Sequence, residues 1–439
     1  MLVNFRVANH RSIRDEQALQ LRWVYEADRL AGSDWPAVPV TGVFGANAAG
    51  KSNIVDALQY MAGMVVDSYR DAEPDGGVPR SPFRLDRESA GEPSWYVVDL
   101  MLGGVRHTYG FSVDDERVQD EWLYTYPHGK RRIIFQRSGE AVEPGHSQPR
   151  SALELVESIT EPNVLFISLA ARSKLPDVRP LYDWFRDGLR FRTARYGLRT
   201  PPVSRMFETP DSFPQLRSLL RAADLGIEDW GVEQVVLDED QLRSQYRGRV
   251  PRSLQRQLDA EGAVEQRRPW VAHRGRDGVV RLDLRDESSG TRALIEQAPQ
   301  FLSVLARGGT FVVDEIDSSL HPLLTAALVR LFQHPESNPR GAQLVFTTHD
   351  ASLLGRVDGE EVLKRDQVWF VEKNALGASE LVALADFKPR LEENRERRYL
   401  GGSYGGVPFI DDSFADALAK RGDDSGENSE AERDQAPLL

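Results

Sequence analysis

Alternating apolar and polar positions predict strands in two parts of the chain. The first residues, MLVNFRVANHRSIRDEQAL, alternate in this way, and we expect them to form a strand of the fold itself. Residues 93–137 contain four further runs, SWYVVDLMLGG, VRHTYGFSVD, VQDEWLYTYP and KRRIIFQRS. Gly103 with Gly104, and His128 with Gly129, supply turns between these runs, so the pattern predicts consecutive antiparallel strands.

Helices are predicted in two other parts of the chain, alone in one and in alternation with strands in the other. Residues 51–71 carry apolar side chains at helical spacing, at Ile54, Val55, Leu58, Met61 and Val65. From residue 281 to residue 386, helices and buried strands alternate, which predicts α/β wiring. Residues 139–280 are mixed and rich in Pro and Arg, with helix-like stretches near 151–160 and 213–223.

The composition fits a protein of two or three domains that contains no disulfide. The chain has 439 residues, of which 40% are apolar, and no cysteine, which excludes disulfides and thiolate metal sites. No uninterrupted apolar run reaches the length of about 18 residues that a membrane span needs. The N-terminal residues lack the charged-then-apolar layout of a signal peptide, so we expect a cytoplasmic protein with no membrane contact.

The charge is unevenly distributed. A net charge of −13 disfavours nucleic-acid binding by the surface as a whole. Residues 243–276 nevertheless contain nine arginines against three acidic residues, so nucleic acid could contact this segment; an ordinary solvated loop is the alternative. Residues 421–439 hold six acidic residues and no aromatic residue, which predicts a disordered acidic tail.

The stretch GANAAGKSN matches the phosphate-binding loop G-x-x-x-x-G-K-[ST]. An apolar strand precedes it and a helix follows it, which favours a nucleotide site over a chance glycine-rich turn. Lys51 would neutralise the β- and γ-phosphates, and the Ser52 hydroxyl would bind Mg²⁺. We therefore expect nucleotide contacts from Gly45, Asn47, Gly50, Lys51, Ser52 and Asn53.

Acidic and imidazole side chains follow two buried strands of the predicted α/β part. Residues 310–313 form a short apolar strand that ends at Asp314 and Glu315. We expect Asp314 to hold Mg²⁺ and Glu315 to deprotonate the attacking water, although acidic pairs at strand ends are also common without such a role. His349 follows the buried strand at 344–347, where α/β sheets collect ligands, and is expected to sense the γ-phosphate.

A second anion-binding helix start lies before the acidic pair. Ser288, Ser289 and Gly290 precede a predicted helix, with backbone N–H groups and a hydroxyl free to contact an anion. One nucleotide site has no use for a second such helix start. We therefore expect Ser288 and Gly290 to contact the γ-phosphate bound by another copy of the chain, although a plain helix cap would look the same.

These four elements, in this order, resemble those of ABC-type ATPases. The resemblance assigns the Walker A motif to residues 45–52, the signature to 288–291, Walker B to 310–315, the D-loop to 317–320 and the switch histidine to His349. It implies an α/β fold, a two-lobed ABC ATPase head with a mixed sheet and an antiparallel β lobe. It also implies ATP and Mg²⁺ as ligands, a catalytic role for Lys51, Glu315 and His349, and a homodimer closed around ATP, with larger assemblies left open.

The branch of this family follows from spacing and flanking motifs. More than 230 residues separate Gly50 from Ser288, whereas transporter ATPases keep the two motifs within about 100 residues, and the opening VNFRVANHRSI resembles the SMC/RecF/OLD branch. DEIDSSLHP, TTHDASLL and ENRERRYLGGSYGGVPFI resemble the prokaryotic RloA/AbiL-type abortive-infection ATPases more narrowly. No Q-loop glutamine is identified, although SPFRLD at 81–86 stands near the expected place.

The resemblance implies a role in anti-phage defence with a separately encoded effector, which can be a Toprim or RloB-like nuclease. We expect no nuclease domain in this chain, because only 90 residues follow His349. The predicted parts are 1–138 (first ATPase lobe), 139–280 (inserted accessory region, mixed α/β or helical), 281–390 (second lobe), 391–420 (C-terminal extension) and 421–439 (tail). Two alternatives stay open: a RecF- or SMC-like DNA-binding ATPase of DNA repair or recombination, and a slow ATPase that serves as a scaffold.

Overall fold

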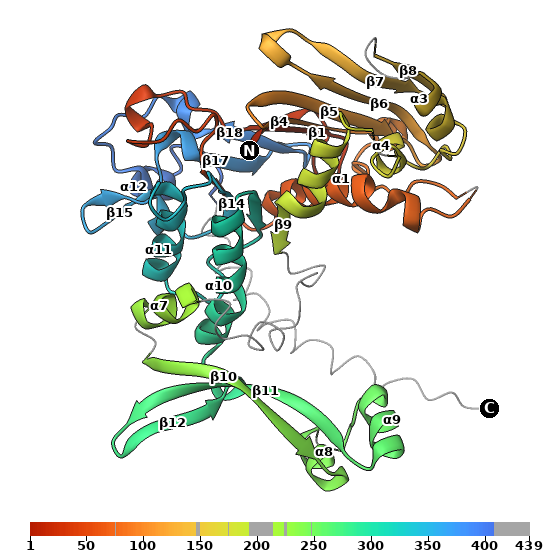
Figure 1. Ribbon diagram of the computed structural model, residues 1–439. Coiled ribbons are helices and arrows are strands. Elements are labelled where there is room, and N and C mark those ends of the chain that lie inside the picture. The colour runs from red at the N-terminus through yellow and green to blue at the C-terminus, as the bar shows by residue number, and fades with distance from the viewer. Residues whose placement is uncertain are drawn as a thin grey trace, which may run out of the picture.

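The computed structural model describes residues 1–74, 76–145, 150–173, 175–192, 214–223, 226–246 and 248–407. These residues form a body built on two large sheets and a projecting part built on a three-stranded sheet (Figure 1). The predicted tail at 421–439, and the predicted extension beyond residue 407, lie outside the described residues.

The first large sheet is antiparallel and has seven strands in the order β2-β1-β4-β5-β6-β7-β8. The prediction of consecutive antiparallel strands in residues 93–137 is confirmed. In the β4–β5 turn, Gly103 and Gly104 have φ angles of 55° and 77°, the left-handed conformation that two-residue hairpins of this twist require. The strands are β1 Leu2–Ala8, β2 Gln17–Gln20, β4 Ser94–Leu102, β5 Val105–Val113, β6 Val118–Thr125, β7 Arg132–Ser138 and β8 Ala141–Pro144.

The second large sheet has six strands in the order β18-β17-β3-β14-β13-β9. All neighbouring strands run parallel except β17 and β18. Because parallel strands end at the same edge of a sheet, the residues that follow β3, β13 and β14 are brought together there. The strands are β3 Val40–Phe44, β9 Leu189–Arg192, β13 Thr310–Val313, β14 Gln343–Thr348, β17 Val368–Lys373 and β18 Ser379–Ala383.

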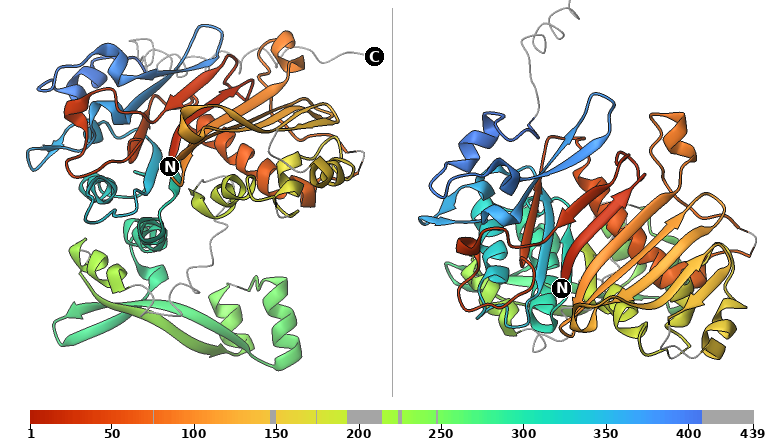
Figure 2. Two further views of the ribbon diagram at one scale, coloured as in Figure 1. Left: turned by 45° about the horizontal axis from the view of Figure 1, so that its top comes forward. Right: turned by 90° about the horizontal axis from the view of Figure 1, so that it is seen from above.

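Helices cover both faces of the six-stranded sheet. The helix α1 Lys51–Asp71 buries its predicted apolar positions in one core that it shares with the antiparallel sheet. The helices α10 Ser289–Arg307 and α11 Pro322–Gln333 cover the other face and share a second core. Figure 2 shows the two large sheets next to each other in the body, apart from the three-stranded sheet. None of the described helices is both long and apolar enough to cross a lipid bilayer.

Part of the predicted inserted region, 139–280, lies in the body. The strand β9 pairs with β13 inside the six-stranded sheet, and the short helix α4 Phe166–Ala170 packs against α1. On β6, the buried Glu121 carboxylate accepts hydrogen bonds from the backbone N–H groups of Phe166 (2.6 Å) and Ile167 (2.9 Å). We expected 139–280 to be a separate region because of its high Pro and Arg content, but its apolar residues between positions 164 and 185 belong to the core of the body.

The projecting part, called the arm below, contains the three-stranded antiparallel sheet in the order β10-β11-β12. At its base, Trp230 and Val271 pack in the same core as α10 and α7 Pro214–Ala222. The helices α8 and α9 close its far end around a separate small core. The elements of the arm are β10 Ile227–Leu237, α8 Glu239–Gln245, α9 Arg252–Glu261, β11 Val264–Gly275 and β12 Gly278–Asp283. The division of the chain into domains stays a prediction.

The fully buried side chain of Gln343 joins the two large sheets. Its Oε1 accepts hydrogen bonds from Leu2 N (2.5 Å) and Thr310 Oγ1 (3.2 Å). Its Nε2 donates to Leu2 O (2.8 Å) and Val38 O (3.1 Å). One side chain at the start of β14 therefore satisfies both backbone groups of the first residue of β1.

We expect Gln343→Ala to destabilise the body. The change leaves the Leu2 N–H and C=O groups buried without this partner, and each such loss costs about 1–3 kcal/mol. The thermal midpoint measured by scanning calorimetry should fall by several degrees. Gln257→Ala, which removes a half-buried side chain that donates a hydrogen bond to Glu261 on the arm, is the control and should leave the midpoint unchanged. An unchanged midpoint in Gln343→Ala would show that strand pairing alone holds β1.

Candidate phosphate-binding site

The glycine-rich loop joins the end of β3 to the start of α1. A Cβ atom on Gly45 would lie 2.5 Å from the carbonyl oxygen of Val371 on β17, so the close approach of β17 requires glycine at this position. Gly50 has a φ angle of 111°, and a Cβ atom there would lie 2.1 Å from the hydroxyl of Ser379. Contacts with strands more than 300 residues away in the chain therefore require glycine at both positions.

Lys51, the first residue of α1, is buried and folds back across this loop. Its Nζ donates hydrogen bonds to Gly45 O (2.7 Å) and Ala46 O (3.0 Å). Burial lowers the pKa of the Lys51 ammonium, while the charges of Glu315, Asp317 and Asp314 raise it. The lysine thus lies between the loop carbonyls and an acidic cluster, where a phosphate could displace its carbonyl partners.

Ser52 meets Asp314 at the edge where β3 and β13 end. The Ser52 hydroxyl donates to Asp314 Oδ1 across 3.0 Å. The Thr347 hydroxyl, at the end of β14, donates to the same oxygen at 2.6 Å and accepts a hydrogen bond from the backbone N–H of Glu315 at 2.8 Å. Thr347 was not among the site residues expected from the sequence. The signal that could have revealed it is a hydroxyl residue two positions before His349 on a buried strand.

The acidic segment after β13 turns sharply beside His349. Glu315 has a φ angle of 54°, an uncommon and strained conformation for a residue with a side chain. His349 Nε2 lies 3.8 Å from Asp317 Oδ2, and 45% of the His349 side chain is exposed. The other carboxylate oxygen of Asp317, Oδ1, is buried without a hydrogen-bond partner. A bound group or a water at this oxygen would supply the missing hydrogen bond.

The predicted signature residues lie at the start of α10. The Ser288 hydroxyl caps this helix: it accepts a hydrogen bond from Thr291 N (3.1 Å) and lies 2.9 Å from Thr291 Oγ1. It is therefore engaged with its own helix, in contrast to the free hydroxyl expected from the sequence. A Cβ atom on Gly290 would lie 2.7 Å from Ser319 O, so the helix start packs against the segment that follows Asp317.

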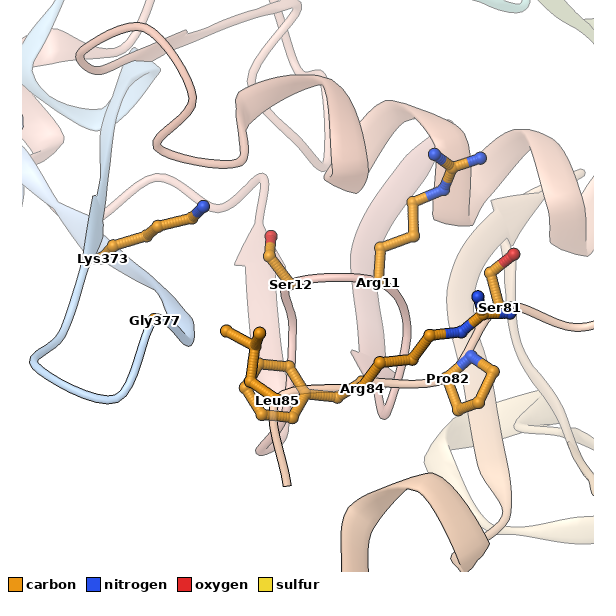
Figure 3. A pocket seen from close by; sticks show the side chains of 9 residues that line it. Arg11, Ser12, Ser81, Pro82, Arg84, Leu85, Lys373 and Gly377 are labelled. Carbon is orange, nitrogen blue, oxygen red and sulfur yellow. The ribbon is translucent and has the colours of Figure 1, made fainter. Parts of the chain in front are cut away.

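A cavity of about 370 Å³ is lined in part by the turn between β17 and β18 (Figure 3). Ser12 of its lining accepts a hydrogen bond from Asn53 Nδ2 of α1 (2.6 Å) and lies 2.7 Å from the Ser379 hydroxyl, which in turn donates to Ala49 O of the loop (2.6 Å). The lining includes the SPFRLD segment whose role the sequence left open. The cavity is lined by Arg11, Ser12, Ser81, Pro82, Phe83, Arg84, Leu85, Lys373 and Gly377.

The residues of the site fit a nucleoside triphosphate with Mg²⁺. A loop that excludes side chains, a lysine and a helix start suit phosphate oxygens, and the Ser52 and Asp314 oxygens suit Mg²⁺. Among the described residues, no group of three or more His, Cys, Asp or Glu side chains could hold a metal ion alone. In Mg²⁺ sites, substrate phosphates and waters commonly supply most ligands. Asn47 is exposed, and Asn53 contacts Ser12.

Comparisons with solved structures find SMC heads. The SMC head domain from Thermotoga maritima is similar with a TM-score of 0.37 and 15% identity, over 87% of this chain and 98% of that chain. The Smc head domain with an extended coiled coil bound to the C-terminal domain of ScpA, from Pyrococcus furiosus, has a TM-score of 0.36 and 12% identity, over 88% and 97% of the two chains. No curated protein matches the sequence.

The family model described as AAA domain, putative AbiEii toxin, type IV toxin–antitoxin system, matches residues 40–355, which run from β3 to just beyond His349. The predicted membership of the chain among ABC/SMC-like AAA ATPases is confirmed, whereas the RloA/AbiL-type assignment stays a prediction. Because the match covers well over half of the 439 residues, the chain belongs to this family of AAA-domain ATPases.

Proposed function

We propose that the protein binds ATP with Mg²⁺, hydrolyses it between two copies of the chain, and uses this cycle to regulate or hold a separately encoded effector. The observation that carries the proposal is the 3.0 Å contact between Ser52 Oγ and Asp314 Oδ1, two Mg²⁺-type ligands that are 262 positions apart in the chain. In the proposed site, Lys51 would neutralise phosphate charge, and Ser52 and Asp314 would hold Mg²⁺, which would supply further positive charge to the phosphates.

The proposed chemistry is attack of water on the γ-phosphate. Glu315 would accept the proton of this water, and its backbone is held in register by Thr347. His349, beside Asp317, would contact the γ-phosphate. Ser288 and Gly290 of the second copy would close the site with the positive end of α10. In this arrangement ATP stabilises the dimer, and hydrolysis releases it.

The proposed biological setting is anti-phage defence. The family description, which names a putative AbiEii toxin of a toxin–antitoxin system, and the RloA/AbiL-type motifs support it. The partner proposed from the resemblance is a Toprim or RloB-like nuclease encoded separately. Co-purification of the neighbouring gene product with this protein, in an ATP-dependent way, is the direct test of the partnership.

A second candidate function, DNA binding by the arm, rests on the exposed arginines of α8, α9 and β11. Part of this charge is neutralised, because Arg243 pairs with Glu239 at 2.6 Å and Arg274 pairs with Glu228 at 2.9 Å. Binding of duplex DNA that falls steeply with salt would favour this function. The family description favours the defence regulator over this second candidate.

We expect Glu315→Gln to bind ATP and to accumulate as a dimer. Removing the proton acceptor should slow phosphate release by about 100-fold or more, since general bases contribute factors of that size. Light scattering after gel filtration with Mg-ATP measures the dimer, and Glu360→Gln, a change at an exposed residue of the short strand β16 Glu360–Glu361, is the control. Hydrolysis at the wild-type rate in Glu315→Gln would remove Glu315 from its proposed role.

We expect mixing of two inactive variants to restore hydrolysis. Lys51→Ala cannot bind phosphate in its own loop, and Ser288→Arg blocks the site of its partner. In a mixed dimer, one site combines the intact loop of the Ser288→Arg chain with the intact helix start of the Lys51→Ala chain. Phosphate release should therefore reappear on mixing, whereas each variant alone stays inactive. No recovery, with mixed dimers demonstrated by differential tagging, would contradict a site shared between two chains.

We expect Thr347→Val to impair hydrolysis more than binding. Valine keeps the volume but removes the hydroxyl that contacts both Asp314 and Glu315, at a cost of about 1–3 kcal/mol, or roughly 10- to 100-fold in rate. Thr347→Ser retains the hydroxyl and should stay close to wild type. Steady-state phosphate release and ATP affinity are measured for both variants. Equal rates for the valine and serine variants would show that Thr347 only fills space.

A further inference from the structure

The last described residues of the chain fold back onto the start of the phosphate loop. They comprise the helix α12 Arg395–Leu400 and the segment 401–407, called the C-terminal turn below. The turn contains four glycines, of which Gly402, Gly405 and Gly406 have φ angles between 68° and 77°. This is the GGSYGG motif of the sequence, to which the proposed function assigns no role.

Backbone packs on backbone where the C-terminal turn meets the loop. A Cβ atom on Gly406 would lie 3.5 Å from both the Cα atom of Gly45 and the carbonyl oxygen of Val371. A Cβ atom on Gly45 would in turn lie 2.5 Å from that carbonyl oxygen. Gly406, Val371 and Gly45 thus contact one another without intervening side chains. A Cβ atom would fit at this distance, but the φ angle of 68° is strained for a β-branched residue, so Gly406→Val disfavours this backbone conformation next to Gly45.

Aromatic rings attach the turn to the strand that carries the loop. The Tyr399 ring stacks on Phe370 with a centroid distance of 5.3 Å, and it meets Phe44 edge-on at 6.1 Å. Phe44 is the residue directly before Gly45. Tyr404 also stacks on Phe370, at 5.4 Å. The Tyr399 hydroxyl donates a hydrogen bond to Gly406 O across 3.1 Å, so the same side chain holds both the turn and the strand end.

The helix before the turn contacts the segment that follows His349. The helix α12 packs against the 3₁₀ turn Ala351–Leu354. A Cβ atom on Gly355 would lie 2.7 Å from a carboxylate oxygen of Glu396 on α12. Residues 395–407 therefore contact the chain beside two of the three strand ends that carry the proposed nucleotide ligands: β3, which leads to Lys51, and β14, which leads to His349.

A buried ion pair fixes the start of α12. The Arg395 guanidinium is 3% exposed, lies 2.8 Å from a carboxylate oxygen of Glu361 and donates to Leu363 O at 3.0 Å. These two contacts attach the start of α12 to residues 361–363.

We propose that the C-terminal turn is a positioning element for the phosphate loop, with Gly406 and Tyr399 as its positioning residues. The inference rests on the proposed function, because it concerns ATP binding at the same loop. Nucleotide binding requires the docked turn, and by thermodynamic reciprocity bound nucleotide strengthens the docking. The turn thereby makes the C-terminal part of the chain responsive to the nucleotide state.

A purely structural role predicts different results. If the aromatic packing only stabilises the fold, its loss lowers the stability of the nucleotide-free protein and leaves the affinity for nucleotide unchanged. If the turn positions the loop, affinity falls in the folded variant, and hydrogen exchange of the turn responds to nucleotide. Affinity and apo-protein stability must therefore be measured on the same samples.

The test uses the full-length variants Gly406→Val and Tyr399→Phe. Gly359→Val is the matched control, because Gly359 has a similar φ angle of 82° and open space around it. With a fluorescent ATP analogue and Mg²⁺, we expect Gly406→Val to bind about tenfold more weakly, a coupling of ordinary size. Tyr399→Phe loses one hydrogen bond and should bind about two- to tenfold more weakly. Gly359→Val should bind like wild type.

Hydrogen exchange gives a second readout that needs no variant. In the wild-type protein, exchange of the amides of residues 401–407 should slow when a non-hydrolysable ATP analogue is added. The inference is overturned if both Tyr399→Phe and Gly406→Val bind nucleotide with wild-type affinity. It is also overturned if added nucleotide leaves the hydrogen exchange of the turn unchanged. If Gly406→Val does not fold, Tyr399→Phe and the exchange measurement decide. Failure of the wild-type protein to bind ATP would refute the proposed function instead.

Discussion

The parallel pairing of β3, β14 and β13 is the constraint on which the rest of the site depends. Val345 and Phe346 of the central strand lie opposite Thr41 and Gly42 on one side and opposite Val312 and Val313 on the other. This register brings three chain ends, far apart in sequence, to one edge of the sheet. A shift of one residue would turn every side chain to the opposite face and separate Ser52 from Asp314. The site therefore needs the whole sheet, and no single segment could form it alone.

The same register explains how buried polar groups are satisfied around the site. Gln343 begins the central strand and bonds both backbone groups of Leu2, while Thr347 near its other end bonds Asp314 and Glu315. Both side chains are fully buried, and hydrogen bonds in such surroundings are costly to break. One strand thus ties the antiparallel sheet at its start and the acidic segment near its end.

The elements that sequence predicted best are those in which the signal is local. The loop, the helix after it and the acidic pair are each defined by residues close together in the chain, and the structure has α1 and β13 at the expected places. The hairpin strands of residues 94–138 follow from alternation and from glycine turns for the same reason. Periodicity depends only on residues that are close together in the chain, so it can be recognised in the sequence without knowledge of the fold.

What could not be predicted depends on distant contacts. The strand β9 has four residues, and only its pairing with β13 marks it as part of the large sheet. The sequence also favoured a free Ser288 hydroxyl, yet the hydroxyl caps its own helix, because a capping bond to Thr291 is always within reach at a helix start. Thr347 and Gly406 resemble ordinary strand and turn residues until the fold places them beside Asp314 and Gly45.

These distant contacts also decide the shape of the phosphate loop. Val371 lies against Gly45, the Ser12 and Ser379 hydroxyls crowd Gly50, and Gly406 covers the start of the loop. The loop is thus enclosed by an N-terminal turn, a strand, a hairpin partner and the C-terminal turn. Because the loop contacts all of these elements, a change in its shape on phosphate binding would displace them. The proposed regulation of an effector requires such coupling between the loop and its surroundings.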